Sequence, residues 1–317
     1  MIIKKRKKPI ILNSYESILA RLRADFTEKE IIEQHYSKSH RHFLGMTSVD
    51  FSLKAIGASY TILHEVYIKV ENQYLEVDNL IITPYTIYII DVNNDIAEPA
   101  FEFTSEQIQH VPYKPKLIIE ELFPFQQLEF KKIQLQKWLE SQDIHHLSIE
   151  AFIVISDPKI MMKIMQDTVP MNESVIMVNK LQKTITDTEE KKSVHSPKID
   201  HQKLGDRLKS VCKKKKINIM KKYSIKEGDV LTGVACPECG KLGMIRHNGK
   251  WQCQSCEHNS KDAHRQALMD YYYIFQRSLT NREASRWLHV KSRHIVKHLL
   301  KHANYVFNKK QQKWFLK

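Results

Sequence analysis

The chain has 317 residues, of which 27% are charged, and carries a formal net charge of +14 at pH 7. No apolar run approaches the roughly 20 residues of a transmembrane helix, which argues against a membrane protein. The basic first residues lack the apolar segment of a secretory signal, so we expect a cytoplasmic protein of about two to three domains.

The basic charge is unevenly distributed. Residues 201–317 contain 26 Lys and Arg against 8 Asp and Glu, a balance of +18, whereas residues 1–200 have a balance of −4. A basic excess confined to the last third of a chain is typical of a segment that binds a polyanion, most often nucleic acid.

The first part of the chain predicts helices followed by an antiparallel hairpin. Capping residues and apolar spacing indicate helices within 13–38 and over 47–56, and residues 60–70 alternate like a strand. Two short apolar runs, 80–83 and 86–90, flank a Thr-Pro-Tyr turn and predict the hairpin.

An aspartate stands at the edge of each hairpin strand. Asp78 opens the first strand and Asp91 closes the second. A carboxylate at the end of an apolar strand is costly to desolvate without a partner, and two side by side could share a Mg²⁺ or Mn²⁺ ion. The alternative is that both simply face water at strand ends.

The middle of the chain completes a mixed α/β domain. We expect a helix over 125–139 and buried strands over 149–156 and 174–178. The polar stretch 183–206 is interpreted as a linker. The lysine run 213–216 is either a solvated segment or a phosphate contact.

Four cysteines predict a metal site. Cys236 and Cys239 form one Cys-x-x-Cys unit, and Cys253 with Cys256 forms a second, 13 residues further on. Two such units can close a tetrahedron around Zn²⁺, and four thiolates leave no open position, so we expect a structural zinc ribbon. Cys212 has no sequence partner and is interpreted as a small buried hydrophobe.

The tail predicts a helix-turn-helix. A helix over 261–276 precedes one capped by Thr280 and another capped by Ser292, and residues 305–316 resemble a two-stranded wing. Basic residues recur every four positions on the last helix, which makes them candidates for contact with nucleic acid: Arg293, Lys297 and Lys301. The alternative is a small helical domain whose basic face keeps it soluble.

The motifs together resemble the nuclease-related domain, NERD, of the restriction-endonuclease-like superfamily. The resemblance rests on Gly45, the strand from Tyr60, the segments beginning at Val77 and Tyr88, and Gln127 on the following helix. Similar proteins also end in a cysteine-pair ribbon and a segment like Asp270-Tyr-Tyr. The resemblance implies a mixed sheet with flanking helices and a metal-dependent nuclease site.

The site implied by the resemblance is altered here. The family pattern has a helix Glu after the Gly, an Asp opening the hairpin, and Glu-x-Lys closing it. This chain has Met46, Asp78, Asp91 and Asn93 at those positions. The resemblance therefore assigns Asp78, Asp91, Asn93 and Gln127 to a degenerate catalytic site, and loss of the lysine is expected to cost roughly 10² to 10³ in rate.

Three functions remain open. The first is a protein that binds nucleic acid, with double-stranded DNA as the expected partner, and has a weakly active or inactive nuclease-like core. The second is a competent Mg²⁺-dependent nuclease with another lysine in place, for which Lys69 is a candidate. The third is a non-enzymatic protein-interaction module. The domain ranges expected are a helical segment 1–39, the nuclease-related domain 40–182, a linker 183–228, the ribbon 229–260 and a winged-helix-like domain 261–317.

Overall fold

The structure is a computed structural model of the whole chain. The residues it describes are 1–93, 100–103, 108–110, 124–145, 147–156, 161–164, 174–194, 197–215 and 217–317. Lys216, the last residue of the lysine run, lies outside the described residues.

The chain forms two compact units that are interleaved in sequence. The first consists of Met1–Lys7 and Lys38–Lys215, and the second of Lys8–Ser37 and Lys216–Lys317. The early helical segment is thus divided between the units, instead of standing alone as residues 1–39. The physical reason is the apolar side of helix α1 (Ile10–Leu19), where Tyr15 and Ile18 belong to the same core as helix α8 (Ala263–Phe275).

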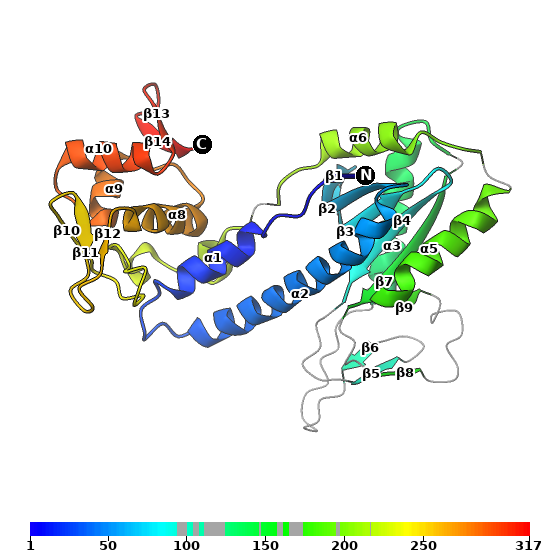
Figure 1. Ribbon diagram of the computed structural model, residues 1–317, viewed down its shortest axis with the longest axis horizontal. Helices are drawn as coiled ribbons and strands as arrows, with labels where there is room; N and C mark the ends of the chain where they lie inside the picture. Colours follow the sequence, from blue (N-terminus) through cyan, green and yellow to red (C-terminus); the bar gives the residue numbers. More distant parts are fainter. Residues whose placement is uncertain are drawn as a thin grey trace. The chain divides into compact units, whose positions relative to one another are not determined.

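A six-stranded mixed sheet organises the first unit, in the order β1-β2-β3-β4-β7-β9 (Figure 1). β2, β3 and β4 pair antiparallel, whereas β1 pairs parallel with β2, and β7 lies parallel to both β4 and β9. The strand bounds are Ile2–Lys4 for β1, Thr61–Val70 for β2, Gln73–Ile82 for β3, Thr86–Val92 for β4, Ser148–Ile155 for β7 and Val175–Met177 for β9. A smaller sheet has the order β6-β5-β8, with β5 at Ala100–Phe103, β6 at Ile108–His110 and β8 at Met161–Ile164.

Both faces of the larger sheet are covered by helices. Alternate residues of each strand point to opposite faces, so Leu80 and Ile81 enter different cores. The core on the Leu80 face includes apolar residues of α3 (Pro124–Glu140) and α6 (His201–Val211). The core on the Ile81 face includes those of α2 (Lys29–Ile56) and α5 (Val178–Ser193). This mixed α/β architecture confirms the fold class expected from the sequence.

Two differences from the expected elements have simple physical reasons. The helices expected within 13–38 and over 47–56 are partly one helix, because α2 continues through Gly45, whose cost inside a helix is only about 1 kcal/mol. Helices α5 and α6 occupy much of the expected linker 183–228. They form because Leu181, Ile185, Leu204 and Leu208 recur at helical spacing and are buried against the sheet.

The second unit combines helices with two small sheets. The ribbon strands are β10 (Ile245–His247), β11 (Lys250–Gln252) and β12 (Asn259–Ser260). Helices α8, α9 (Asn281–Leu288) and α10 (Arg293–His302) follow, and then the hairpin of β13 (Tyr305–Asn308) and β14 (Lys313–Leu316). The short elements before the ribbon are α7 (Ile219–Lys222) and the 3-10 helix Glu227–Asp229.

A buried ion pair joins the turn after α1 to α8 within this unit. The Arg21 guanidinium lies 2.8 Å from the carboxylate of Asp270, and the two side chains are only 1% and 8% exposed. Arg21 also donates to the carbonyl of Gly233 at 3.0 Å and stacks on the ring of Trp287 at 4.6 Å. The carboxylate of Asp270 neutralises this buried charge, although Nη2 of Arg21 has no hydrogen-bond partner among the described residues.

No helix in the described part of the chain is long and apolar enough to cross a membrane.

Candidate functional site

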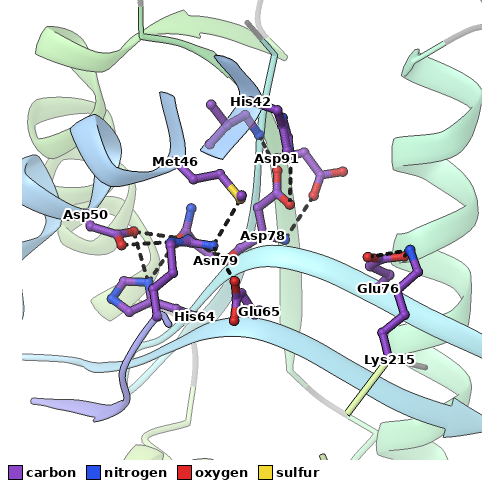
Figure 2. A network of polar contacts seen from close by, with 12 residues as sticks. His42, Met46, Asp50, His64, Glu65, Glu76, Asp78, Asn79, Asp91 and Lys215 are labelled. Atoms are coloured by element: carbon purple, nitrogen blue, oxygen red, sulfur yellow. Dashed lines mark hydrogen bonds and ion pairs between the residues drawn. The ribbon is translucent and has the colours of Figure 1, made fainter. Parts of the chain in front are cut away.

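The two hairpin aspartates lie side by side on neighbouring strands (Figure 2). One carboxylate oxygen of Asp78 accepts a hydrogen bond from the backbone N–H of Val92 at 2.8 Å. The backbone N–H of Asp78 in turn points at a carboxylate oxygen of Asp91, 3.4 Å away. The side chains are 19% and 18% exposed. The hairpin thus places two partly buried carboxylates together at one edge of the site.

A lysine on helix α3 lies beside the two carboxylates. The ammonium of Lys131, on α3, forms an ion pair with Asp91, and its side chain is 21% exposed. Its charge also acts on Asp78. Lys69, the candidate expected from sequence, is exposed on β2 and pairs in register with Tyr74, away from the aspartates. The lysine beside the carboxylates is therefore Lys131.

The two aspartates are electrostatically different. Burial raises the pKa of Asp91 to about 6, an effect that Lys131 opposes and the charge of Asp78 adds to. Burial would also raise the pKa of Asp78, but its contact with His42 and the charge of Lys131 hold that pKa below the usual value. Two close carboxylates with separated pKa values form a pair in which one is ionised before the other.

Helix α2 lines the same site with three side chains one turn apart (Figure 2). The ring Nε2 of His42 lies 3.5 Å from a carboxylate oxygen of Asp78. Met46, at the position where the resemblance expects a glutamate, is 5% exposed. Asp50 follows one turn later and faces a different partner, Arg6. The helix therefore presents an imidazole, but no carboxylate, to the Asp78–Asp91 pair.

Arg6 fills the space behind the site. Its guanidinium makes two hydrogen bonds to the Asp50 carboxylate, at 2.8 and 3.0 Å. It also donates to the carbonyl oxygen of Asp78 at 3.0 Å and to the side-chain oxygen of Asn79 at 2.6 Å. A further nitrogen lies 3.0 Å from the sulfur of Met46. The Arg6 side chain is 4% exposed, so it fixes the backbone that carries Asp78.

Two further residues complete this buried network. Nδ1 of His64 lies 2.7 Å from the side-chain oxygen of Asn79 and 3.2 Å from Asp50. Burial lowers the pKa of His64 although Asp50 opposes the shift. Glu65, which the strand pairing of β2 with β3 skips, has a left-handed backbone with φ of 53°. Its carbonyl accepts a hydrogen bond from Lys4 at 2.7 Å, so β1 and the residues after it hold the sheet beside the site.

The other two residues assigned by the resemblance lie just after β4 and on α3. The backbone N–H of Asn93 donates to the carbonyl of Val154 at 2.9 Å, which continues the pairing of β4 with β7. Gln127 lies exposed on α3, one turn before Lys131. That spacing is the signal that sequence reasoning missed, because residues four apart share one helix face. Arg6 and His42 carry no comparable sequence signal, since both meet the hairpin only through the tertiary fold.

The four paired cysteines converge as expected. Their sulfur atoms lie within 4.8 Å of one another, and the Cys236–Cys256 and Cys239–Cys253 sulfur pairs are 3.6 Å apart. A tetrahedral centre with Zn–S bonds of about 2.3 Å has sulfur atoms about 3.8 Å apart, so these four thiols could hold zinc. The backbone N–H of Ser255 points at Cys253, and such donors lower the pKa of that thiol to about 6. A thiolate is the form that binds the metal.

Cys212 lies elsewhere, in the first unit, where it packs partly buried against the core on the Leu80 face. The three basic residues expected to contact nucleic acid, Arg293, Lys297 and Lys301, are all exposed on α10.

A six-stranded mixed sheet between helices, with paired carboxylates at the hairpin, defines a restriction-endonuclease-like α/β domain. Residues 41–156 match the family model of the nuclease-related domain, NERD. The match contains Asp78, Asp91 and Lys131 but covers less than half of the chain, leaving out Arg6 and the whole cysteine ribbon. Comparisons with curated proteins and with solved structures found no match.

Proposed function

We propose that this protein binds nucleic acid and that its nuclease-related domain is a slow, metal-dependent phosphodiesterase. The observation that carries the proposal is the Lys131–Asp91 ion pair beside Asp78. It supplies, from helix α3, the cation that the strand position Asn93 lacks. Of the weakly active and the inactive core that the sequence left open, this supports the weakly active one.

The donor set fits a divalent cation. Two partly buried carboxylates are the oxygen ligands that Mg²⁺ and Mn²⁺ prefer. Burial is the largest cause of the raised pKa of Asp91, and the charge of Asp78 adds a repulsion that a bound cation would relieve. A bound ion would stabilise charge on the phosphate oxygens and lower the pKa of its water.

The side chains of the site have separate roles in the proposal. Asp78 and Asp91 hold the ion. Lys131 places a positive charge beside the scissile phosphate, where negative charge develops during hydrolysis. A cation held by both carboxylates would lower the pKa of the attacking water, so that its proton can leave to solvent near neutral pH. The rate is expected to be low because Met46 removes a carboxylate from α2.

A second candidate function is binding without cleavage, and one observation favours it. His42 approaches the Asp78 carboxylate at 3.5 Å, and Arg6 lies 3.0 Å from the sulfur of Met46. A protonated His42 would compete with a cation for Asp78. In this second candidate function the protein still binds nucleic acid. The site does not cleave it, and its positively charged side chains only contact the phosphates.

The second unit is proposed to supply the binding. We assign it a structural zinc ribbon, held by the four cysteines, and a winged helix-turn-helix made of α9, α10 and the β13–β14 hairpin. The support is the sulfur geometry, the three exposed basic residues of α10 and the +18 balance of residues 201–317. Double-stranded DNA is the proposed partner, because α10 has the form of a major-groove helix.

Nicking of a supercoiled plasmid in Mn²⁺ tests the proposal. Wild type is expected to nick slowly, and Asp78→Ala is expected to abolish nicking while leaving plasmid binding unchanged. Plasmid binding without any nicking by wild type would select the second candidate function. Absence of binding at low salt would refute both.

A further inference from the structure

A cleft lies between the β10–β11 hairpin of the ribbon and helix α10 in the second unit. Its volume is about 390 Å³. The residues that line it are Arg246, Asn248, Gly249, His294, Ile295 and His298. None of the six is acidic, and three carry basic side chains. The cleft is thus a concave basic surface shared by two elements that are far apart in sequence.

Arg246 lines this cleft and forms no ion pair with any carboxylate in the described part of the chain. Its guanidinium stacks over the ring of Trp251, at 5.3 Å from the centroid. Its Nη1 nitrogen is buried and has no hydrogen-bond partner among the described residues. A buried donor without a partner costs roughly 1 to 3 kcal/mol. Stacking on Trp251 fixes the orientation of the guanidinium, and a guanidinium in the wall of a cleft can bind an anion through its remaining donors.

The surroundings add to the positive potential. His294 and His298 lie one turn apart on α10 and are both exposed. Arg246 also contributes, after burial and His302, to lowering the pKa of nearby His264 to about 4. Because the described structure pairs no carboxylate with Arg246, His294 or His298, this potential is available to an anion in the cleft.

We propose that the cleft binds a phosphate group of a nucleic-acid strand. Arg246 is the forked donor to the phosphate oxygens, and His294 and His298 donate from the opposite wall. Ile295, which is 40% exposed, gives the adjoining sugar an apolar surface. The inference deepens the proposed nucleic-acid binding and rests on it for the source of the phosphate.

The cleft would extend the basic row of α10 toward the ribbon. Lys297 follows His294 by three positions and Lys301 follows His298 by three, so the two rows are adjacent on the helix surface. A strand that follows the basic row would therefore pass over the mouth of the cleft. The ribbon then has a direct role in binding, beyond its support of the fold.

Two measurements on the full chain, purified with its metal, test the proposal. The first is binding of a 20-base-pair duplex over a range of salt concentrations. Arg246→Ala is expected to weaken binding about 10-fold and to reduce the salt slope by about one unit. Lys241→Ala is the matched control, because it removes one charge from an exposed position of the same ribbon. Arg246→Lys is expected to restore little, since it keeps the charge and loses the fork.

The second measurement replaces the duplex by inorganic phosphate and follows the side-chain N–H signal of Arg246 by NMR. A saturable shift is expected in wild type and in Lys241→Ala, but not when His294 and His298 are both changed to Ala. No shift in wild type would overturn the cleft as a phosphate site. If duplex binding fails while this shift persists, the proposed nucleic-acid binding fails and the anion site stands. Equal weakening of duplex binding by Arg246→Ala and Lys241→Ala would overturn the role of the cleft in nucleic-acid binding.

Discussion

The ammonium of Lys131 is ion-paired with the carboxylate of Asp91, although 40 positions separate the two residues in the sequence. The pair links helix α3 to the end of strand β4 and places a positive charge beside two carboxylates. It is the relationship on which the proposed chemistry depends.

Lys131→Ala is expected to lower the rate of plasmid nicking by about 10² to 10³, because it removes the preorganised cation. Lys132→Ala is the matched control. That neighbour pairs with Glu129 at 3.1 Å instead of with the site, and its loss should leave the rate within about twofold. Equal rates for the two variants would exclude Lys131 from the reaction.

A lysine at position 93 is expected to substitute for Lys131. Residues 91 and 93 lie on the same side of an extended strand, so the new ammonium would approach the carboxylates from the strand. The double variant Lys131→Ala with Asn93→Lys should nick plasmid at least about tenfold faster than Lys131→Ala alone. The same nicking assay gives the answer, with Asp78→Ala added to the double variant as the negative control.

The stability of the metal-free protein is expected to depend on pH through Asp91. The pKa of its carboxyl is raised to about 6 in the fold from the ordinary 3.8. The stability contributed by protonated Asp91 is therefore complete below pH 4 and is lost as the pH rises through 6. Without metal, wild type should lose up to roughly 3 kcal/mol of unfolding free energy from pH 4 to 7, relative to Asp91→Asn.

Mn²⁺ requires the ionised carboxylate and should act in the opposite direction. We expect it to stabilise wild type at pH 7.5 and to have little effect at pH 5. Thermal unfolding with and without the ion measures both effects. If Mn²⁺ stabilises Asp91→Asn as much as it stabilises wild type at pH 7.5, the ion does not bind at Asp91.

Arg6→Ala is expected to destabilise the first unit by about 3 to 5 kcal/mol, because it leaves the carboxylate of Asp50 buried without its partner. Lys5→Ala removes a charge one residue away, at an exposed position, and should cost less than about 0.5 kcal/mol. Chemical denaturation compares the two. The double variant Arg6→Ala with Asp50→Ala should be less unstable than the sum of the single changes.

Gly205→Ala tests how closely α6 approaches the sheet. A Cβ atom there would lie 2.4 Å from Cγ2 of Thr61 and 3.0 Å from Cδ1 of Ile3. The clash is expected to cost about 1 to 3 kcal/mol of unfolding free energy. Gly228→Ala is the control, since nothing lies within 4 Å of the added atom. Equal stability of the two variants would mean that α6 shifts freely.

The sequence by itself determined the local features of this protein. The Thr-Pro-Tyr turn and the two apolar runs beside it defined the hairpin and placed Asp78 and Asp91 at its edge. The spacing of the four cysteines brought their sulfur atoms together, because each Cys-x-x-Cys unit is a local structure. Capping residues such as Thr280 and Ser292 located α9 and α10, where the structure shows both side chains accepting the expected backbone hydrogen bonds.

Only the tertiary structure decided which distant residues meet the site. Lys131 reaches Asp91 because α3 packs across the sheet, and Arg6 reaches Asp78 because β1 pairs with β2. The cleft at Arg246 likewise exists only where the ribbon meets α10. Turns, helix caps and the faces of strands follow from local patterns, because the residues that interact are only a few positions apart in the sequence. The charges at a site depend on which elements pack together, and that is set by the burial of whole faces.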